Sequence, residues 1–258
     1  MPEQMLAALA GQDATFWVTA VIGVVLFGLA KGGFAGLGVL AVPIMALGMN
    51  PVTAAALLLP ILIVQDMFSV RAFGAHRDNG LLKLMVPGAF LGILAGWALA
   101  RFVSVSVVEL ALGLIAIAFG LQRIIAERRG IPPRTGAAWE SLVFGAAAGF
   151  TSQIAHAGGP PFQMHVLPRK LPRDIFIGTS SVFFAIINWL KVPAYWALGA
   201  FTPPNLWLAL ILIPAAIIST WAGTVLVRRV DGPVFYAIMH ALMILVGMKL
   251  AWDGYLAL

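Results

Sequence analysis

Two lysines inside long apolar stretches are the first candidates for chemistry in this sequence. Lys31 directly precedes the glycine pair Gly32-Gly33, and Lys191 follows Asn188 by three residues, so that Asn188 and Lys191 share one face of a helix. A charged side chain in apolar surroundings is costly unless it has a partner or water, and it therefore marks a functional site. Two such cations with an amide predict an anion-binding site. Snorkelling of Lys191 to a nearby membrane interface is the alternative.

A second glycine pair, Gly158-Gly159, is followed by two prolines and surrounded by polar residues. Gln153 and His156 precede it on a shared helical face, and Gln163 follows it. Two glycines and two prolines end one helix and suit the start of the next, whose free N–H groups can bind an anion. We therefore predict one substrate-binding site, made of Lys31, Gly32, Gly33, Gln153, His156, Gly158, Gly159, Gln163, Asn188 and Lys191.

Asp66 is an acidic residue within the apolar run at residues 52–70. A carboxylate in such surroundings can take up a proton and couple its movement to transport. His156 can do the same near neutral pH. Asp66 and His156 are therefore the predicted proton-coupling residues. The alternative for Asp66 is a structural role as the partner of Arg71 or of a lysine.

The chain has no cysteine, which excludes thiol chemistry and cysteine-ligated metals. Two histidines, His156 and His165, are a weak metal signal by themselves, so we predict neither a metal nor a cofactor. A membrane-embedded metal-dependent enzyme or assembly factor that uses these histidines stays as an alternative. The sequence lacks Gly-Lys-Ser/Thr, Gly-x-Ser-x-Gly and His-Glu-x-x-His motifs. We therefore expect a protein that is not an enzyme.

Membrane-spanning helices must position these residues. Of the 258 residues, 61% are hydrophobic and only 10% are charged. Since a spanning helix needs about 20 apolar residues, the composition provides for about eight spans and excludes an ordinary soluble protein. The formal net charge of +6 would suggest nucleic acid as the partner of a soluble chain. Here Lys and Arg cluster in short loops between apolar runs, which predicts the lipid bilayer as the partner and no nucleic acid.

The apolar runs form two similar halves. Val86-Pro87-Gly88-Ala89 aligns with Ile213-Pro214-Ala215-Ala216, and the same shift maps Gly96 onto Gly223. We predict an all-α, polytopic transmembrane fold of about 8–10 helical segments in two inverted repeats, each beginning with a glycine-broken helix pair. The predicted domains are a first transmembrane repeat at 1–128, a basic cytoplasmic linker at 129–137 and a second transmembrane repeat at 138–258.

The inversion follows from the basic loops, which the positive-inside rule places on the cytoplasmic side. These loops are residues 71–83, 123–134, 169–173 and 228–229. Both termini then lie outside, and each half crosses the membrane three times after a broken pair that enters and returns to the same side. Inverted repeats with interrupted helices are typical of secondary transporters, whose site lies between the repeats.

The polar residues belong to longer motifs, which are Ala30 to Gly38, Gln153 to Gln163, Leu171-Pro172-Arg173, Gly178-Thr179-Ser180 and Phe184 to Tyr195. Together they resemble the TauE/SafE sulfite exporter family of the 4-toluene sulfonate uptake permease (TSUP) superfamily. The resemblance implies a multi-pass protein of the bacterial inner membrane that exports sulfite or small organosulfonate anions and is coupled to protons. An anion channel is a further alternative. The sequence indicates no oligomeric state.

Overall fold

The computed structural model describes residues 11–99, 102, 104–129 and 135–258. Within these residues the chain forms ten α-helices, two short 3-10 helices and no strand, so the predicted all-α class is confirmed. The first half contains α2 (Ala14–Lys31), η1 (Leu37–Leu40), α3 (Ala41–Met45), α4 (Pro51–Phe73), α5 (Asn79–Leu99) and α6 (Val105–Arg128). The second half contains α7 (Ala138–Ala155), α8 (Gly159–Val166), η2 (Leu167–Arg169), α9 (Arg173–Ala197), α10 (Pro203–Arg228) and α11 (Gly232–Leu256). Residues 1–10 of the predicted first repeat and 130–134 of the predicted linker lie outside the described residues.

Local sequence signals begin several of these helices. The Asp13 carboxylate accepts a hydrogen bond from the backbone N–H of Phe16 at 2.8 Å and caps α2. Thr202 caps α10 in the same way, directly before two prolines that suit the first helical turn. Prolines also open α8, after Gly158 and Gly159. α8 therefore begins at the second glycine pair, directly before its two prolines.

In the described part of the chain, six helices are long and apolar enough to cross a membrane, as judged by length and composition. They are α2, the Thr53–Phe73 part of α4, α5, α9, α10 and α11. Large apolar side chains such as Leu91, Ile218 and Trp221 are exposed on them, which is the surface expected of a protein that faces lipid. The chain is thus a polytopic all-α membrane protein.

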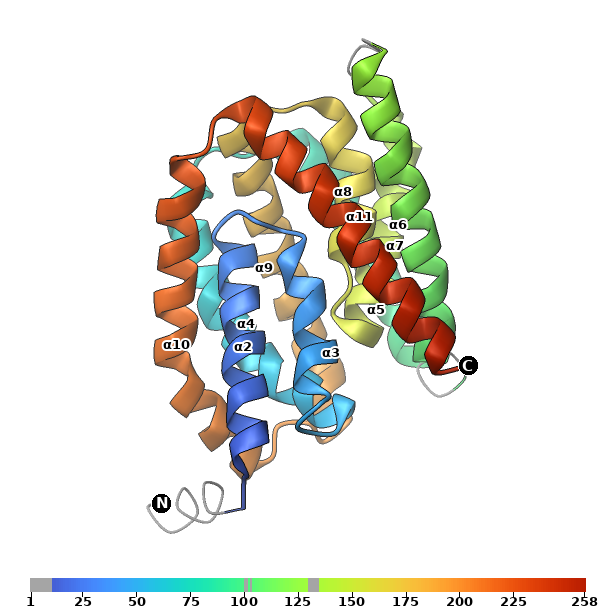
Figure 1. The fold of residues 1–258 in the computed structure, drawn as a ribbon. Helices are drawn as coiled ribbons and strands as arrows, with labels where there is room; N and C mark the ends of the chain where they lie inside the picture. The colour runs from blue at the N-terminus through green and yellow to red at the C-terminus, as the bar shows by residue number, and fades with distance from the viewer. Residues whose placement is uncertain (1–10, 100–101, 103, 130–134) are drawn as a thin grey trace.

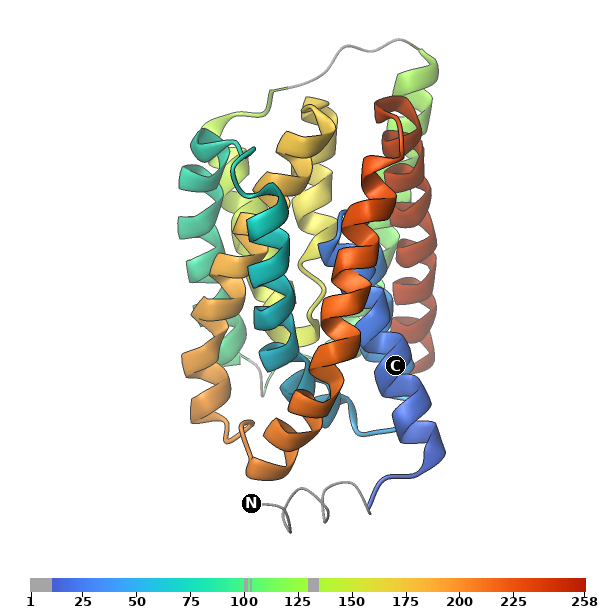
Figure 2. The same cartoon turned by 90° about the vertical axis from the view of Figure 1, so that its left-hand side faces the viewer.

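The two interrupted helix pairs turn back inside the helix bundle (Figure 1). α2 ends within the bundle, and α3 returns toward the end from which α2 started. α7 enters from the opposite end, and α8 returns in the same manner (Figure 2). The loops between α4 and α5, between η2 and α9, and between α10 and α11 all lie at one end of the bundle, which we call the basic end. The shared position of these loops agrees with the predicted topology; which side of the membrane the basic end faces stays a prediction.

Helices of the two halves pack against each other throughout. α5 lies along α7, α2 along α10, α4 against α9 and α6 against α11. Glycines allow the close approach: a Cβ atom on Gly32 would lie 2.5 Å from the Cα of Gly223, and one on Gly92 would lie 2.0 Å from the carbonyl oxygen of Ala146. Each half therefore completes the packing of the other, as two related repeats would; the repeat boundaries themselves stay a prediction.

Candidate functional site

Both helix interruptions depend on unusual backbone conformations. Gly33 has a φ of 138°, a region that residues with a Cβ atom rarely adopt. α7 ends at His156, whose φ of 50° is left-handed, and the N–H of Ala157 then bonds to the carbonyl of Thr151 at 3.2 Å. The two breaks bring Lys31 and His156 to the ends of helices inside the bundle. They present polar side chains where an unbroken helix would cross with apolar ones.

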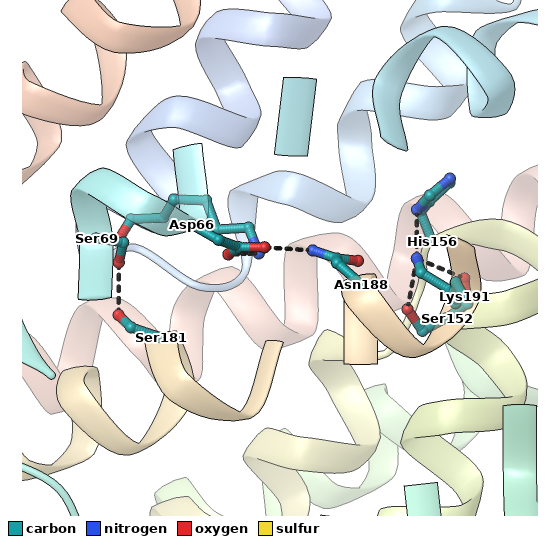
Figure 3. Close-up of polar contacts among 8 residues, drawn as sticks. Asp66, Ser69, Ser152, His156, Ser181, Asn188 and Lys191 are labelled. Atoms are coloured by element: carbon teal, nitrogen blue, oxygen red, sulfur yellow. Dashed lines mark hydrogen bonds and ion pairs between the residues drawn. The ribbon is translucent and has the colours of Figure 1, made fainter. Parts of the chain in front are cut away.

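Asp66 joins the two halves at the first break (Figure 3). Its Oδ1 lies 2.5 Å from the Nζ of Lys31, and its Oδ2 accepts a hydrogen bond of 2.6 Å from Nδ2 of Asn188. Asp66 is 2% exposed. Of the two structural partners weighed for Asp66, Arg71 is exposed and Lys31 makes the contact. The charges of Lys31 and Asp66 therefore compensate each other.

Two serines form hydrogen bonds next to this ion pair. The Ser69 hydroxyl donates to the carbonyl of Lys31 at 2.6 Å, and it lies 2.5 Å from the hydroxyl of Ser181 on α9. The Nζ of Lys31 also lies 5.2 Å from the ring centroid of Phe184, within the range of a cation–π contact. The end of α2 is thus held by both α4 and α9.

Lys191 is fully buried, with 0% exposure, on the next turn of α9 after Asn188. Its Nζ donates to Nδ1 of His156 at 2.9 Å, to Oγ of Ser152 at 3.1 Å and to the carbonyl of Ser152 at 3.3 Å. No carboxylate of the described residues forms a salt bridge with it. The amine does not snorkel to an interface, and a charge on it would have no carboxylate partner among the described residues.

The partners of His156 define which ring nitrogen carries the proton. An ammonium group at Nδ1 only donates, and the carbonyl oxygen of Ala55, 3.2 Å from Nε2, only accepts. A neutral imidazole with its hydrogen on Nε2 satisfies both, and this assignment rests on the partners. The hydroxyl of Tyr195 lies 3.0 Å from the same Nε2. His156 therefore connects Lys191 to Tyr195.

A central cavity with an empty volume of about 610 Å³ lies between the two breaks. Among the predicted site residues, those that line it are Lys31, Gly33, His156, Gly159 and Asn188. Ser152 lines it too, so Lys191 lies one contact behind the wall and acts through Ser152 and His156. The rest of the wall is largely apolar and includes Phe27, Val39, Leu62, Phe176 and Phe184.

Besides Lys191 and Asp66, four predicted residues do not line the central cavity. Gly32 packs against Gly223, and Gly158 packs near the carbonyl of Ala148. Gln163 is buried with 1% exposure. Gln153 lines a second hollow on the other side of His156. Gly32 and Gly158 have a packing role in the structure, because a Cβ atom on either would lie less than 3.0 Å from backbone atoms.

Ser69, Ser152, Ser181 and Tyr195 belong to the same contact network but were not among the predicted site residues. Helical spacing is the signal that would have identified them. Ser69 follows Asp66 by three residues, Ser152 precedes His156 by four, and Tyr195 follows Lys191 by four. These hydroxyls share the faces of the charged residues that the sequence already marks.

His165 lies apart from His156 and has other partners. Its Nε2 is 2.8 Å from the hydroxyl of Ser141 and 2.9 Å from Nη2 of Arg169. Each of the two imidazoles thus has a cationic side chain beside it, which opposes the binding of a metal ion. In the part of the chain that the structure describes, no group of three or more His, Cys, Asp or Glu side chains could hold a metal.

A helical membrane protein with broken helices around an interior cavity that contains a few polar side chains has the architecture of a membrane transporter. The family model of the sulfite exporter TauE/SafE matches residues 20–250, which is most of the chain. The chain therefore belongs to the TauE/SafE family, and the predicted resemblance is confirmed. Comparisons with curated proteins and with solved structures gave no match.

Proposed function

We propose that this protein is a secondary transporter that exports sulfite or a small organosulfonate across the bacterial inner membrane in exchange for, or together with, protons. Membership of the TauE/SafE family supports an anion exporter in general terms. The observation that carries the more specific proposal is Lys191, a fully buried lysine one contact behind the wall of the central cavity, with no carboxylate partner among the described residues.

The charge balance of the site favours a small anion. Lys31 and Asp66 neutralise each other, so a protonated Lys191 leaves the site with one uncompensated positive charge. A buried charge without a partner is strongly unfavourable, and one anion in the cavity would provide that partner. The Ser152 hydroxyl, the Asn188 amide and the backbone N–H of Gly159 offer hydrogen bonds to its oxygens.

The apolar part of the cavity wall favours a substrate that has an apolar portion or little charge. Phe176 and Phe184 line the cavity on α9, and Leu62 lines it on α4. A sulfonate places its charged oxygens and its organic group at opposite ends of one molecule. Such a molecule would fit a site with Lys191 behind one wall and aromatic rings on another.

Asp66 provides a route to proton coupling. Protonation of its carboxyl group would remove the ion pair with Lys31 and free the Lys31 ammonium group to face the cavity, which it already lines. Proton uptake would thus add a second cation to the site and raise its affinity for an anion. His156, whose imidazole is neutral in its present contacts, is the second candidate for carrying the proton.

Reconstitution in liposomes tests the proposal. We expect sulfite flux that saturates with concentration and rises with a proton gradient, and we expect the double variant Lys191→Ala/His156→Ala to lose it. The matched control is Lys83→Ala, which removes an exposed lysine from α5. Unchanged flux in the double variant would refute the site assignment. Flux that neither saturates nor responds to protons would favour the anion channel.

A further inference from the structure

α9 lines two separate hollows, one toward each end of the bundle. The central cavity follows α9 from Phe176, one turn from the helix start at the basic end, to Asn188. Twelve residues of helix correspond to about 18 Å. A second hollow, which we call the vestibule, is lined on α9 by Tyr195 and continues over Leu198 and Gly199 at the opposite end. Its empty volume is about 2020 Å³.

His156 connects the walls of the two hollows. His156 lines the central cavity, whereas Tyr195 and Ala55 line the vestibule. The same Nε2 of His156 lies 3.0 Å from the Tyr195 hydroxyl and 3.2 Å from the Ala55 carbonyl. The contacts between the two hollows therefore include one imidazole, one phenol and one backbone carbonyl, which are joined by hydrogen bonds.

The end of α9 that carries Tyr195 lies between a proline and a glycine, which allow it to bend relative to the rest of the helix. Pro193 lies inside the helix, and a proline there removes one backbone hydrogen bond and weakens the helix locally. Gly199, with a φ of 68°, follows the helix end. Tyr195 is thus placed on a short segment between a proline and a glycine in the left-handed region, while Asn188 and Lys191 lie before the proline.

We infer that Tyr195 and His156 form the gate between the central cavity and the vestibule, and that Tyr195 is the positioning residue that closes it. The inference rests on the proposed function, because a gate matters only if an anion passes through both hollows. His156 contacts Lys191 through Nδ1 and Tyr195 through Nε2. An anion that accepts hydrogen bonds from the Lys191 ammonium group would weaken the bond between Lys191 and His156. The same imidazole ring forms the contact with Tyr195 that closes the gate. Substrate binding and gate opening are coupled through one ring.

Cysteine labelling tests the gate without any knowledge of the substrate, since the natural chain has no cysteine. Ser180→Cys places a thiol in the central cavity, and Ala200→Cys places one in the vestibule. Each variant is reconstituted, and a membrane-impermeant thiol reagent is added to one face at a time. The face from which Ala200→Cys reacts defines the vestibule side, so the test does not depend on the predicted orientation.

From the vestibule side we expect Ala200→Cys to react and Ser180→Cys to be protected. Tyr195→Ala should then expose Ser180→Cys from that side, with a rise in rate of at least about tenfold, and Tyr195→Phe should give a smaller rise because it removes only the hydroxyl. Trp196→Ala is the matched control, since it removes an aromatic ring that is 73% exposed on the same helical turn. It should leave Ser180→Cys protected.

Reaction of Ser180→Cys from the vestibule side as fast as that of Ala200→Cys, in the background with Tyr195 intact, would overturn the gate, and so would equal exposure by Trp196→Ala and Tyr195→Ala. Because the first of these results needs no substitution at the gate, a misfolded Tyr195→Ala variant does not remove the test. Protection and exposure as expected, without sulfite flux, would support the gate and refute the proposed substrate. Sulfite flux with an unprotected Ser180→Cys would support the substrate and refute the gate.

Discussion

The two buried lysines differ in one respect that decides their roles. Lys31, at the end of α2, has a carboxylate partner in Asp66 at 2.5 Å. Lys191, on α9, has a hydroxyl, a carbonyl and an imidazole nitrogen, but no carboxylate partner among the described residues. An ion-paired lysine suits a switch, because protonation of its carboxylate partner breaks the ion pair. An uncompensated cation suits permanent attraction for an anion.

The largest effect is expected for Lys191→Met. Methionine has a similar length and no charge, so the variant loses the charge that attracts the anion, and we expect sulfite affinity to fall by about 100-fold or more. Because the native amine is buried and has no carboxylate partner among the described residues, its removal should leave the melting temperature in detergent unchanged or raise it. Sulfite flux and thermal unfolding of the same preparation check both parts. A large fall in melting temperature would show that the charge of Lys191 is compensated after all.

Lys31→Met should behave in the opposite way. It leaves Asp66 buried without its ion pair, which should cost about 3 kcal/mol of unfolding free energy. The double variant Lys31→Met/Asp66→Asn removes both charges and should recover most of that loss. Thermal unfolding of the single and double variants measures the coupling. Additive effects of the two substitutions would contradict the compensation of Lys31 by Asp66.

The two glycine breaks should differ as well. Gly33→Ala forces a φ of 138° on a residue with a Cβ atom, which would also lie 2.8 Å from Val227, so we expect a loss of about 1–3 kcal/mol. Gly159→Ala should change stability little, since its Cβ atom would lie 3.4 Å from the nearest atom, the Ala35 carbonyl oxygen. Comparable melting temperatures for these two variants would show that the first break does not need its backbone conformation.

The smallest effect concerns coupling. Asp66→Asn keeps the hydrogen-bonding shape of the side chain but cannot exchange a proton. We expect sulfite counterflow without a gradient to continue while stimulation by a proton gradient disappears. A response to the gradient equal to that of the natural chain would assign the proton to another group, with His156 as the next candidate.

The sequence predicted the class of the fold and the location of the site more accurately than it predicted the contacts within the site. The apolar runs and glycine pairs located the interrupted helices, and the spacing of Asn188 and Lys191 placed both on one face of α9, because these signals are local. Which lysine pairs with Asp66 depends on how α2 packs against α4. No local pattern encodes the bond from Asn188 to Asp66, since those residues come from different halves of the chain.

Gln153 illustrates the same limit. Its spacing from His156 predicts that both lie on one face of a helix, and we predicted one site for both. In the structure, the left-handed turn at His156 directs its ring to the central cavity, while Gln153 lines the vestibule. A single backbone angle at the end of a helix thus separates two residues that helical periodicity groups together.

The central claim is that the uncompensated charge of Lys191 holds the anion. Equilibrium binding of radiolabelled sulfite to the purified protein tests it most directly, with Lys191→Met and Lys83→Met measured beside the natural chain. We predict saturable binding of about one anion per chain, which Lys83→Met retains and Lys191→Met loses. Binding to Lys191→Met with the affinity of the natural chain would contradict the account.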